Sequence, residues 1–335
     1  MLNKDTIRTI ESTLREKTVA IIGDFCLDIY WQADMTRSEL SRETPHFPLP
    51  VVEERVSLGA GGNVAANLAA LRPKEILAVS LYGDDWRGNL LAEQVRKIGI
   101  SPDRLVPSGL PFTNAYCKPL RKGISATVYE DPRLDFENDA TISAETERVV
   151  ISRLHEVTEK ADVLCVADQF RYGIVTDAVR KEIISLAKNG LPVVVDSRYR
   201  IAEYTNCILK PNEVECWKAV YGNDGYLCAD EAAFISAAEK LAENNRAAVF
   251  CTLGDKGSYI IDGNVKIKTP ALPLSGPLDI CGAGDTTLAA FTCALAAGAG
   301  FAEASELAAM ASAVTVKKIG VTGTATFNEI LALSN

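Results

Sequence analysis

Short apolar runs recur along the chain, and longer stretches with helical periodicity separate them. The runs lie at residues 19–22, 76–81, 163–167, 193–196, 208–210 and 248–253. The helical stretches lie at residues 63–71, 86–98, 176–188, 213–220 and 231–243. Nearly continuous apolar runs are typical of parallel strands that are buried on both faces. The alternation predicts an α/β fold, with a doubly wound, mostly parallel sheet and helices on both faces.

Two segments interrupt this alternation, at about residues 31–57 and 112–137. Both contain strand-like stretches, and neither is followed by a crossover helix. We expect them to form a small β lid across one end of the sheet. The sequence has no long linker, internal repeat or low-complexity tract, so we expect residues 1–335 to form a single domain.

The overall charge restricts the range of partners. The net charge is −9 and the isoelectric point is about 5.0, which argues against nucleic acid and anionic membranes as partners. The nine cysteines form no C-x-x-C pair, and several lie inside apolar runs, which is typical of reduced thiols in a cytoplasmic protein. Residues 1–15 lack the apolar core of a signal peptide. The uncharged stretch at residues 286–302 is interpreted as a buried helix and a turn, not as a membrane span.

A glycine-bearing turn carries the strongest chemical signal. Residues 279–285 read D-I-C-G-A-G-D and lead directly into an apolar helical stretch. The first amides of a helix have no intrahelical acceptor and lie at the positive end of its dipole. We therefore expect Gly282, Ala283 and Gly284 to form a cradle for a phosphoryl group. Asp285, at the edge of this cradle, is the candidate that removes a proton from an attacking hydroxyl.

A second glycine cluster, Gly61 and Gly62 followed by Asn63, also precedes a helical stretch. Alone it favours a tight turn with close helix packing; the functional alternative is a site for sugar hydroxyls, which Asn63 binds as donor and acceptor. Two acids, Asp24 and Asp28, follow the first predicted strand. A carboxylate there is either a helix cap or a clamp that accepts from two hydroxyls, and Asp28 is the candidate for the clamp.

Asn212 and Glu215 follow another predicted strand. Their spacing predicts a capping box, and it is also compatible with a hydrated magnesium site. Several other sites are excluded. The sequence has no Gly-Lys dipeptide, so it has no Walker A loop, and no G-x-G-x-x-G follows the first strand. The presence of only two histidines, His46 and His155, argues against H-E-x-x-H zinc chemistry and most Ser-His-Asp arrangements.

Taken together, these motifs resemble the PfkB (ribokinase-like) carbohydrate kinase family over nearly the whole chain. Residues 279–285 match the family's D-x-x-G-A-G-D signature, and residues 59–63 match its N-terminal glycine-rich signature less closely. Asn212 and Glu215 match the N-x-x-E element. The segment T-L-G-D-K-G at residues 252–257 is similar to the family's nucleotide-side turn.

The resemblance implies transfer of a phosphoryl group from ATP to a hydroxyl of a sugar or sugar phosphate. It implies that Asn212 and Glu215 reach Mg²⁺ through water, and that Asp279 is a ligand of a monovalent cation such as K⁺. It places the adenine near the late helix, at residues 311–318. The residues that it assigns to the nucleotide are Asn212, Glu215, Thr252, Gly254, Asp255 and Gly257. It also implies a homodimer in which the lids of two subunits pair.

Within the family, the sequence is most similar to the D-glycero-β-D-manno-heptose-7-phosphate kinases. The similar segments are at residues 27–31, 41–45, 48–52, 133–137 and 323–326. This resemblance implies that the acceptor is the C1 hydroxyl of D-glycero-D-manno-heptose 7-phosphate, and a 7-phosphate requires cations. The candidates, each equally compatible with a solvated surface charge, are Arg42, Lys118, Arg121, Arg133 and Arg198. Many such kinases are fused to a nucleotidyltransferase; here we expect any later activation step to belong to another protein.

Several positions depart from the family pattern near the expected substrate. Ala60 stands where glycine is usual, and Ile29 follows Asp28 where the heptose kinases commonly have arginine. Ile280 and Cys281 replace the usual pair before the cradle. Two alternatives therefore stay open: a kinase of another sugar or nucleoside, of the ribokinase or fructokinase type, and a catalytically silent sugar or nucleotide sensor.

Overall fold

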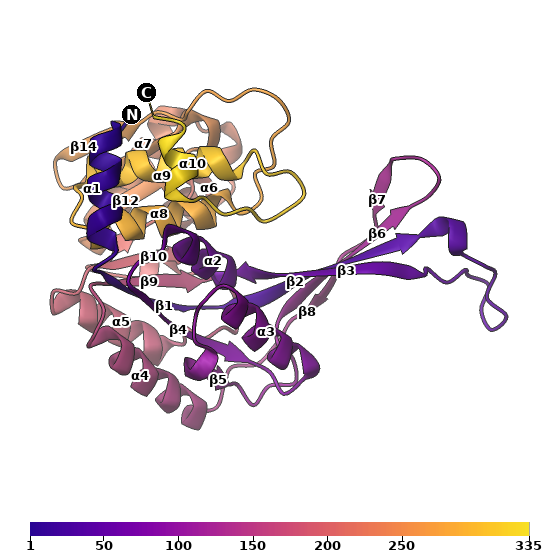
Figure 1. Cartoon of the computed structure of the whole chain (residues 1–335). Coiled ribbons are helices and arrows are strands. Elements are labelled where there is room, and N and C mark those ends of the chain that lie inside the picture. Colours follow the sequence, from indigo (N-terminus) through magenta and orange to yellow (C-terminus); the bar gives the residue numbers. More distant parts are fainter. Residues whose placement is uncertain (335) are drawn as a thin grey trace.

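The computed structural model describes residues 1–334, and a nine-stranded sheet forms its centre (Figure 1). The strand order is β14-β13-β12-β11-β10-β9-β1-β4-β5, and every neighbouring pair is parallel except β12–β13 and β13–β14. The strands are β1 (Thr18–Gly23), β4 (Glu75–Tyr82), β5 (Leu105–Pro107), β9 (Val163–Asp168), β10 (Val193–Ser197), β11 (Ile208–Leu209), β12 (Val249–Thr252), β13 (Ser258–Asp262) and β14 (Val265–Thr269). Each of the six predicted apolar runs overlaps one of these strands, which confirms the mostly parallel sheet.

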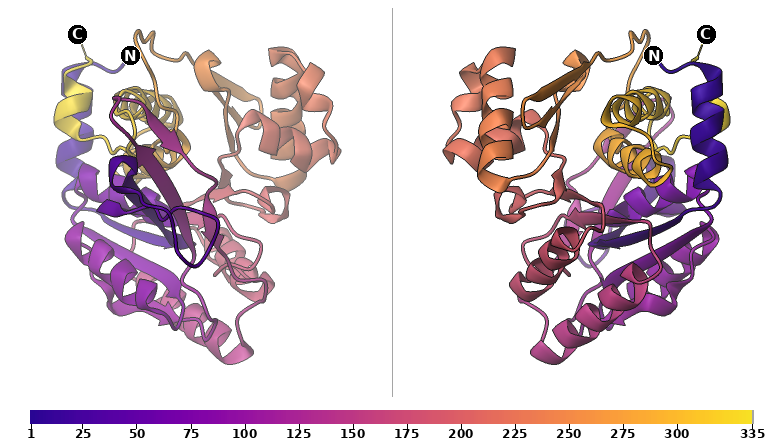
Figure 2. Two further views of the ribbon diagram at one scale, coloured as in Figure 1. Left: turned by 90° about the vertical axis from the view of Figure 1, so that its right-hand side faces the viewer. Right: turned by 90° about the vertical axis from the view of Figure 1, so that its left-hand side faces the viewer.

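Helices cover both faces of this sheet, as predicted (Figure 2). On β1, Val19 and Ile21 pack into one hydrophobic core, whereas Ala20 and Ile22 pack into the other. The first core is covered by α1 (Lys4–Leu14), α2 (Gly61–Leu71), α3 (Trp86–Lys97), α8 (Ala283–Ala296), α9 (Phe301–Thr315) and α10 (Phe327–Leu331). The second is covered by α4 (Ala144–Thr158), α5 (Asp177–Lys188), α6 (Glu213–Tyr221) and α7 (Glu231–Asn245).

A second, five-stranded sheet forms the small β lid and is called the lid sheet below. Its strands are β2 (Phe25–Asp34), β3 (Val51–Ala60), β6 (Ala115–Lys122), β7 (Val128–Glu130) and β8 (Leu134–Phe136). The antiparallel β2–β3 ribbon projects away from the main body together with β6 and β7 (Figure 1). The sheet starts earlier than the predicted segment, since only Asp24 separates β2 from β1.

The architecture defines where ligands bind. β1 lies between β4 and β9. After β1 the chain adds β4 and β5 on one side of it and later adds β9 and β10 on the other, so the carboxyl ends of these strands border a topological switch point. Helix α2 begins there, and the Gly61 amide donates to the Asp24 carbonyl at 2.8 Å. Ligands of open α/β sheets bind in the crevice at such an edge.

Helix α1 was not predicted. Its core-facing residues, Ile7, Ile10 and Leu14, have helical spacing, and the Asn3 side chain caps it by accepting from the Thr6 amide at 2.8 Å. The uncharged stretch at residues 286–302 forms a buried helix and a turn, as predicted. It contains most of α8 and the turn that leads into α9. Among the described residues, no helix combines the length and the apolar character that a membrane crossing requires.

Candidate active site

Helix α8 begins at the predicted glycine turn. Gly282 is its N-cap and has φ of 80°, a left-handed conformation that glycine adopts without strain. A Cβ atom at Gly282 would lie 2.8 Å from Nδ2 of Asn63, so a larger residue would also collide there. Cys281 and Gly284 are exposed, and solvent therefore reaches the start of the helix.

The amides of this turn are not equivalent. The Ala283 amide donates to the Ile280 carbonyl at 3.2 Å. Within residues 1–334, the Gly282 and Gly284 amides have no protein acceptor. Since unsatisfied amides at a helix N-terminus attract anions, the expected three-amide cradle is reduced in this structure to Gly282 and Gly284.

Asp285 lies in the first turn of α8 and contacts the second glycine cluster. The Asn63 side chain donates from Nδ2 to Oδ2 of Asp285 at 2.6 Å. Asn63 is buried, and the Asn67 side chain donates to its carbonyl at 3.0 Å. Thr286 in turn donates to Oδ1 of Asn67 at 2.9 Å. The starts of α2 and α8 are thus held together, and Asp285 is fixed by residues on both helices.

The environment of Asp285 favours a role in proton transfer. The pKa of its carboxyl is raised to about 7, mainly by burial and also by the nearby Asp196, although the hydrogen bond from Asn63 and the charge of Lys210 act to lower it. A carboxylate whose pKa lies near the working pH is suited to act as a general base.

This pKa predicts the acidic side of the pH–rate profile. Protonated Asp285 is too weak a base to accept the hydroxyl proton, so we expect kcat/KM to fall about tenfold per pH unit below about pH 7 and to level off above it. Initial rates between pH 5 and 9, at fixed ionic strength, measure this. A profile that is flat down to pH 5 would contradict the assignment of Asp285 as the base.

Asp28 lies on β2, beside a cation from the neighbouring strand β6. The Lys118 ammonium is 2.8 Å from Oδ1 of Asp28, and it donates to the Tyr30 hydroxyl at 3.1 Å. Both Asp28 and Lys118 are largely shielded from solvent, with side chains 10% and 13% exposed. The predicted clamp therefore presents an acceptor and a donor side by side.

Arg133 approaches the same region from the connection before β8. Its guanidinium binds both carboxylate oxygens of Asp135, at 2.6 and 2.7 Å, and it lies 4.2 Å from the centre of the Tyr116 ring. Tyr116 is the register partner of Asp28 across β2 and β6. The structure thus brings two predicted cations, Lys118 and Arg133, toward Asp28.

The other predicted cations do not reach Asp28 within this chain. Arg42 is exposed in the connection beyond β2, and the strand from Asp28 to Asp34 alone covers about 20 Å at the usual rise per residue. Arg121 pairs with Asp131 at 2.7 Å, farther out on the lid sheet. Arg198 is exposed after the end of β10.

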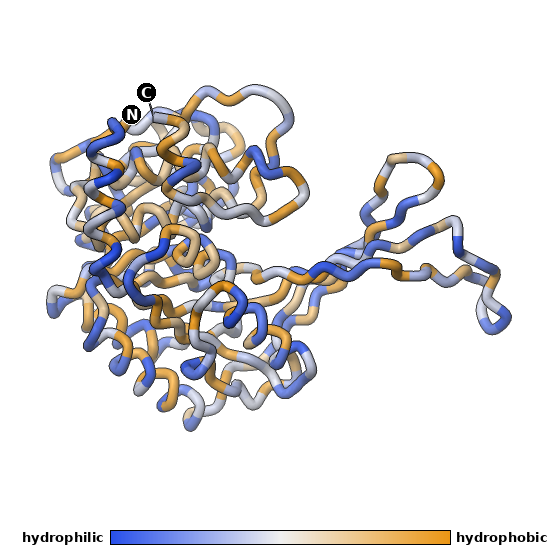
Figure 3. Tube along the Cα trace, viewed as in Figure 1, coloured by the Kyte–Doolittle hydropathy of each residue, from blue (hydrophilic) through white to orange (hydrophobic). Residues whose placement is uncertain are grey.

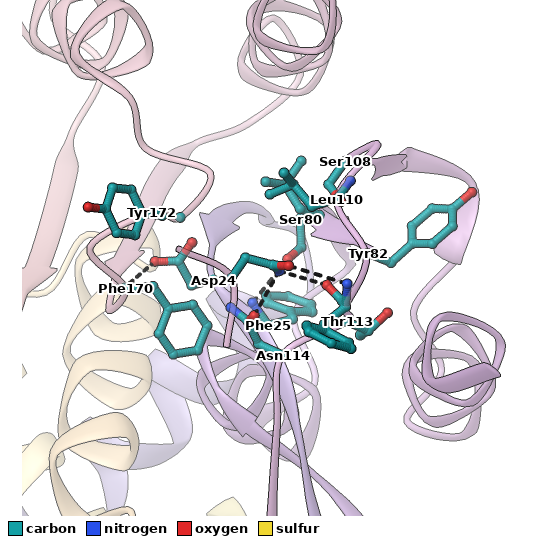
Figure 4. A pocket seen from close by; sticks show the side chains of 14 residues that line it. Asp24, Phe25, Ser80, Tyr82, Ser108, Leu110, Thr113, Asn114, Phe170 and Tyr172 are labelled. Carbon is teal, nitrogen blue, oxygen red and sulfur yellow. Dashed lines mark hydrogen bonds between the residues drawn. The ribbon is translucent and has the colours of Figure 1, made fainter. Parts of the chain in front are cut away.

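Asp24 is not part of a sugar clamp. Its carboxylate accepts from the backbone amides of Gln169, Phe170 and Ile174 at 2.7–2.8 Å, and so it holds the loop after β9. It also borders a polar niche of about 20 Å³, together with Ser80 and other residues shown in Figure 4. That volume has room for about one water molecule and is too small for a sugar.

Asn212 and Glu215 form the predicted capping box. The Glu215 amide donates to Asn212 at 2.8 Å, and the Asn212 amide donates to Oε2 of Glu215 at 2.9 Å. The pKa of Glu215 is raised to about 7, mainly by burial and also by Asp196, although the charge of Lys210 acts to lower it. Because the capping bond uses only Oε2, the second oxygen of Glu215 is available to a metal-bound water.

The predicted nucleotide turn lies next to this capping box. Thr252, at the end of β12, forms a bridge with Asn212, and Gly254 and Asp255 are exposed. Gly257 has a structural reason to be glycine: its φ is 89°, and a Cβ there would lie 2.1 Å from the Thr269 carbonyl oxygen.

Asp279 connects the glycine turn to the loop after α9. Its carboxylate accepts from the Cys281 amide at 3.0 Å and from the Gly320 amide at 2.9 Å. The Gly320 carbonyl accepts from Arg55 of β3 at 2.9 Å, so the lid sheet is joined to the same loop.

Two charged residues of the site were not predicted. Lys210 follows β11 and is buried, and its ammonium is 2.7 Å from Oδ2 of Asp196 on β10. Both are polar residues at the carboxyl end of an apolar strand, which is the signal that could have identified them.

Comparison with known proteins agrees with this geometry. Residues 17–327 match the family described as pfkB family carbohydrate kinase. The chain is 31% identical over 305 residues to the Bifunctional protein HldE of Geobacter sulfurreducens, and 32% identical over 324 residues to that of Rhodopseudomonas palustris. These alignments cover 90% and 93% of this chain and 59% and 62% of the relatives, so the chain spans about three fifths of their length.

Among solved structures, phosphofructokinase-2 from Escherichia coli in complex with substrates and products has a TM-score of 0.73 at 18% identity. Ribokinase from Arabidopsis thaliana complexed with ribose and ATP has a TM-score of 0.67 at 22% identity. Each comparison covers 95% of this chain and 98% of the other, which confirms the ribokinase-like fold. With its family signature placed at an open helix N-terminus beside a half-buried acid, the chain belongs to the pfkB family of carbohydrate kinases.

Proposed function

We propose that this kinase transfers the γ-phosphoryl group of ATP to the C1 hydroxyl of D-glycero-D-manno-heptose 7-phosphate. The catalytic part of this proposal rests on the contact between Asn63 and Asp285 at 2.6 Å, directly beside the open amides of Gly282 and Gly284. A base and an anion cradle at one solvent-accessible edge are the two parts that phosphoryl transfer to an alcohol requires.

In this proposal Asp285 aligns the sugar hydroxyl and accepts its proton. The hydroxyl oxygen forms a bond to the γ-phosphorus while the bond to the ADP oxygen breaks. The Gly282 and Gly284 amides stabilise the charge on the transferred group. Asp28 and Asn63 hold other hydroxyls, which fixes the direction of attack, and Gly61 and Gly62 leave room for the sugar at the start of α2.

Magnesium, when bound, neutralises charge between the phosphates. The free oxygen of Glu215 and the side chain of Asn212 fit a water-mediated contact with it. The exposed turn at Gly254 and Asp255 fits the nucleotide side of the site. Asp279 is the candidate ligand of a monovalent cation, since its carboxylate already orders the loop beside the cradle.

The heptose 7-phosphate is the acceptor that similarity supports. The chain resembles heptose-7-phosphate kinases in the lid segments, and Lys118 and Arg133 approach Asp28 from the lid sheet. A kinase assay with ATP and a panel of sugars and sugar phosphates, heptose 7-phosphate included, tests this substrate. Faster turnover of heptose 7-phosphate than of neutral sugars is expected.

A variant of Arg133 tests the phosphate contact separately. We expect Arg133→Ala to raise KM for heptose 7-phosphate about tenfold or more with little change in kcat, because one charge-assisted contact is lost. Arg121→Ala, which removes a paired arginine farther out on the lid sheet, is the matched control. Equal KM values for the two variants would contradict a role for Arg133 in binding the 7-phosphate.

One observation favours a second candidate, a kinase of a neutral sugar. Lys118 and Arg133 are both paired already, with Asp28 and Asp135, so their charges are largely compensated. If neutral sugars are the better substrates in the panel, the heptose proposal is wrong and the sugar kinase assignment is unaffected.

We further propose a homodimer through the lid sheet. Its strands and loops carry exposed apolar side chains, which recur along the projecting part of the chain (Figure 3). These residues are Leu40, Phe47, Val51, Val52, Ile124, Val128, Tyr129 and Leu134. Exposed apolar surface at strand edges is a common basis for association, and sedimentation of the purified chain measures its oligomeric state.

A further inference from the structure

Three side chains form a row across the lid sheet, on the face that carries Asp28. Tyr30 is the register partner of Arg55 on β3 and of Lys118 on β6. Tyr30 lies two residues beyond Asp28 on β2, so these two side chains share one face of the strand. The Arg55 guanidinium lies 4.3 Å from the centre of the Tyr30 ring, and the Lys118 ammonium lies 4.7 Å from it. Because Lys118 pairs with Asp28 at 2.8 Å, the row connects the β3 edge of the lid sheet to the proposed acceptor clamp.

Arg55 extends this row to the main body. Its guanidinium donates to the Gly320 carbonyl at 2.9 Å, across 265 residues of sequence. The loop that contains Gly320 is bound to the glycine turn in two places. The Gly320 amide donates to the Asp279 carboxylate at 2.9 Å, and the Asp279 amide donates to the Val316 carbonyl at 2.8 Å. A continuous set of contacts therefore runs from the acceptor clamp to the start of α8.

The contact of Arg55 differs from those of the other lid cations. Lys118, Arg121 and Arg133 each pair with an aspartate, so their charges are compensated within the lid. Arg55 instead binds a backbone carbonyl of the main body while it packs on Tyr30. A guanidinium suits both contacts at once, since its N–H groups point outward in its plane and its face stacks on aromatic rings.

We propose that Arg55 is a positioning residue that holds the lid sheet against the glycine turn. This inference rests on the proposed function, in which the acceptor lies between Asp28 on the lid sheet and Asp285 on α8. The β2–β3 ribbon leaves the main body beside β1 and projects away from it (Figure 1). A contact farther along the ribbon fixes its angle, and with it the distance from Asp28 to the cradle. The direction in which the acceptor hydroxyl approaches the phosphoryl group depends on this distance.

Hydrogen exchange of the unliganded chain tests the contact directly. Arg55→Met keeps the length of the side chain and removes its donors. The backbone amides of residues 316–323 are expected to exchange about 5- to 10-fold faster in this variant than in the wild type, because their loop loses one attachment. Arg121→Met, which removes a lid arginine paired with Asp131, is the matched control and should exchange like the wild type. Arg55→Lys keeps a cation and a donor, and it should restore most of the protection.

Kinetics test the consequence for the reaction. With ATP and heptose 7-phosphate, Arg55→Met is expected to raise KM for the sugar phosphate about tenfold and to change KM for ATP less than about twofold. Arg55→Lys should recover most of the lost acceptor affinity. Because Arg55 is exposed, the thermal midpoint of Arg55→Met should equal that of the wild type, and so should its sedimentation coefficient.

Wild-type exchange at residues 316–323 in Arg55→Met would overturn the proposal, and so would a wild-type KM for the acceptor. An altered sedimentation coefficient would overturn it as well, because Arg55 would then act at a contact between subunits. If the wild type does not phosphorylate heptose 7-phosphate, the proposed acceptor is wrong, and the exchange measurement still decides whether Arg55 holds the lid sheet to the glycine turn. Normal turnover of heptose 7-phosphate by the wild type, with normal exchange and kinetics of Arg55→Met, would refute this inference alone.

Discussion

Replacing Asp285 with asparagine should lower kcat by about three to four orders of magnitude while ATP still binds. Asparagine keeps the size of the side chain and still accepts the hydrogen bond from Asn63, but it does not take the hydroxyl proton. The loss should therefore appear in kcat and not in the affinity for ATP. Steady-state kinetics combined with calorimetric titration of ATP measure both quantities.

The same variant should fold at least as well as the wild type. The pKa of Asp285 is raised from its ordinary value near 3.8 to about 7. For an acid with a raised pKa, ionisation favours the unfolded chain, so the wild type loses stability as the pH rises from about 4 to about 7. Asparagine does not titrate, and the thermal midpoint of Asp285→Asn at pH 8 should equal or exceed that of the wild type.

Asp262→Asn is a suitable control, because Asp262 is exposed at the end of β13. Its kcat and thermal midpoint should both match the wild type. Near-normal turnover of Asp285→Asn would refute the assignment of the base. A large loss of stability in that variant would instead mean that the carboxylate of Asp285 stabilises the folded chain.

Much of the fold follows from local patterns. Strands that are buried on both faces have to be apolar over several consecutive residues, so runs such as 163–167 identify them directly. Helix α1 was missed because its apolar stripe of Ile7, Ile10 and Leu14 is separated by charged and polar residues. The lid sheet could be located but not delimited, since nothing local shows where the chain leaves β1 and begins β2.

The site depends on contacts between distant segments. Asn63 and Asp285 are 222 residues apart, and their contact follows from resemblance to a family and not from any local rule. Asp24 and Asp28 lie close together after the same predicted strand. The structure separates them, because a loop 145 to 150 residues away uses the carboxylate of Asp24 for its own amides. Lys210 lies at the end of a predicted apolar run, and its approach to Gly284 depends on how α8 lies over the sheet.

Replacing Gly284 with alanine should remove most activity without loss of stability. A Cβ atom at this position would meet only Nζ of Lys210, at 4.0 Å, which is an ordinary contact. Alanine also favours the helix over glycine by up to about 1 kcal/mol. Yet the new methyl group would project beside the Gly284 amide at the start of α8, where the phosphoryl group is proposed to lie. Displacing a reacting group by about 1 Å costs on the order of 100-fold in rate.

Gly282→Ala supplies the contrast that makes this result interpretable. Gly282 has φ of 80°, and a Cβ there would lie 2.8 Å from Nδ2 of Asn63 and 2.9 Å from Cγ2 of Thr322. Alanine at that position strains the backbone and disturbs the residue that fixes Asp285, so both the thermal midpoint and kcat should fall. Gly284→Ala should lower kcat alone. If Gly284→Ala keeps wild-type turnover, the transferred phosphoryl group does not lie over this helix terminus, because the space that the methyl group fills would then be unused in the reaction.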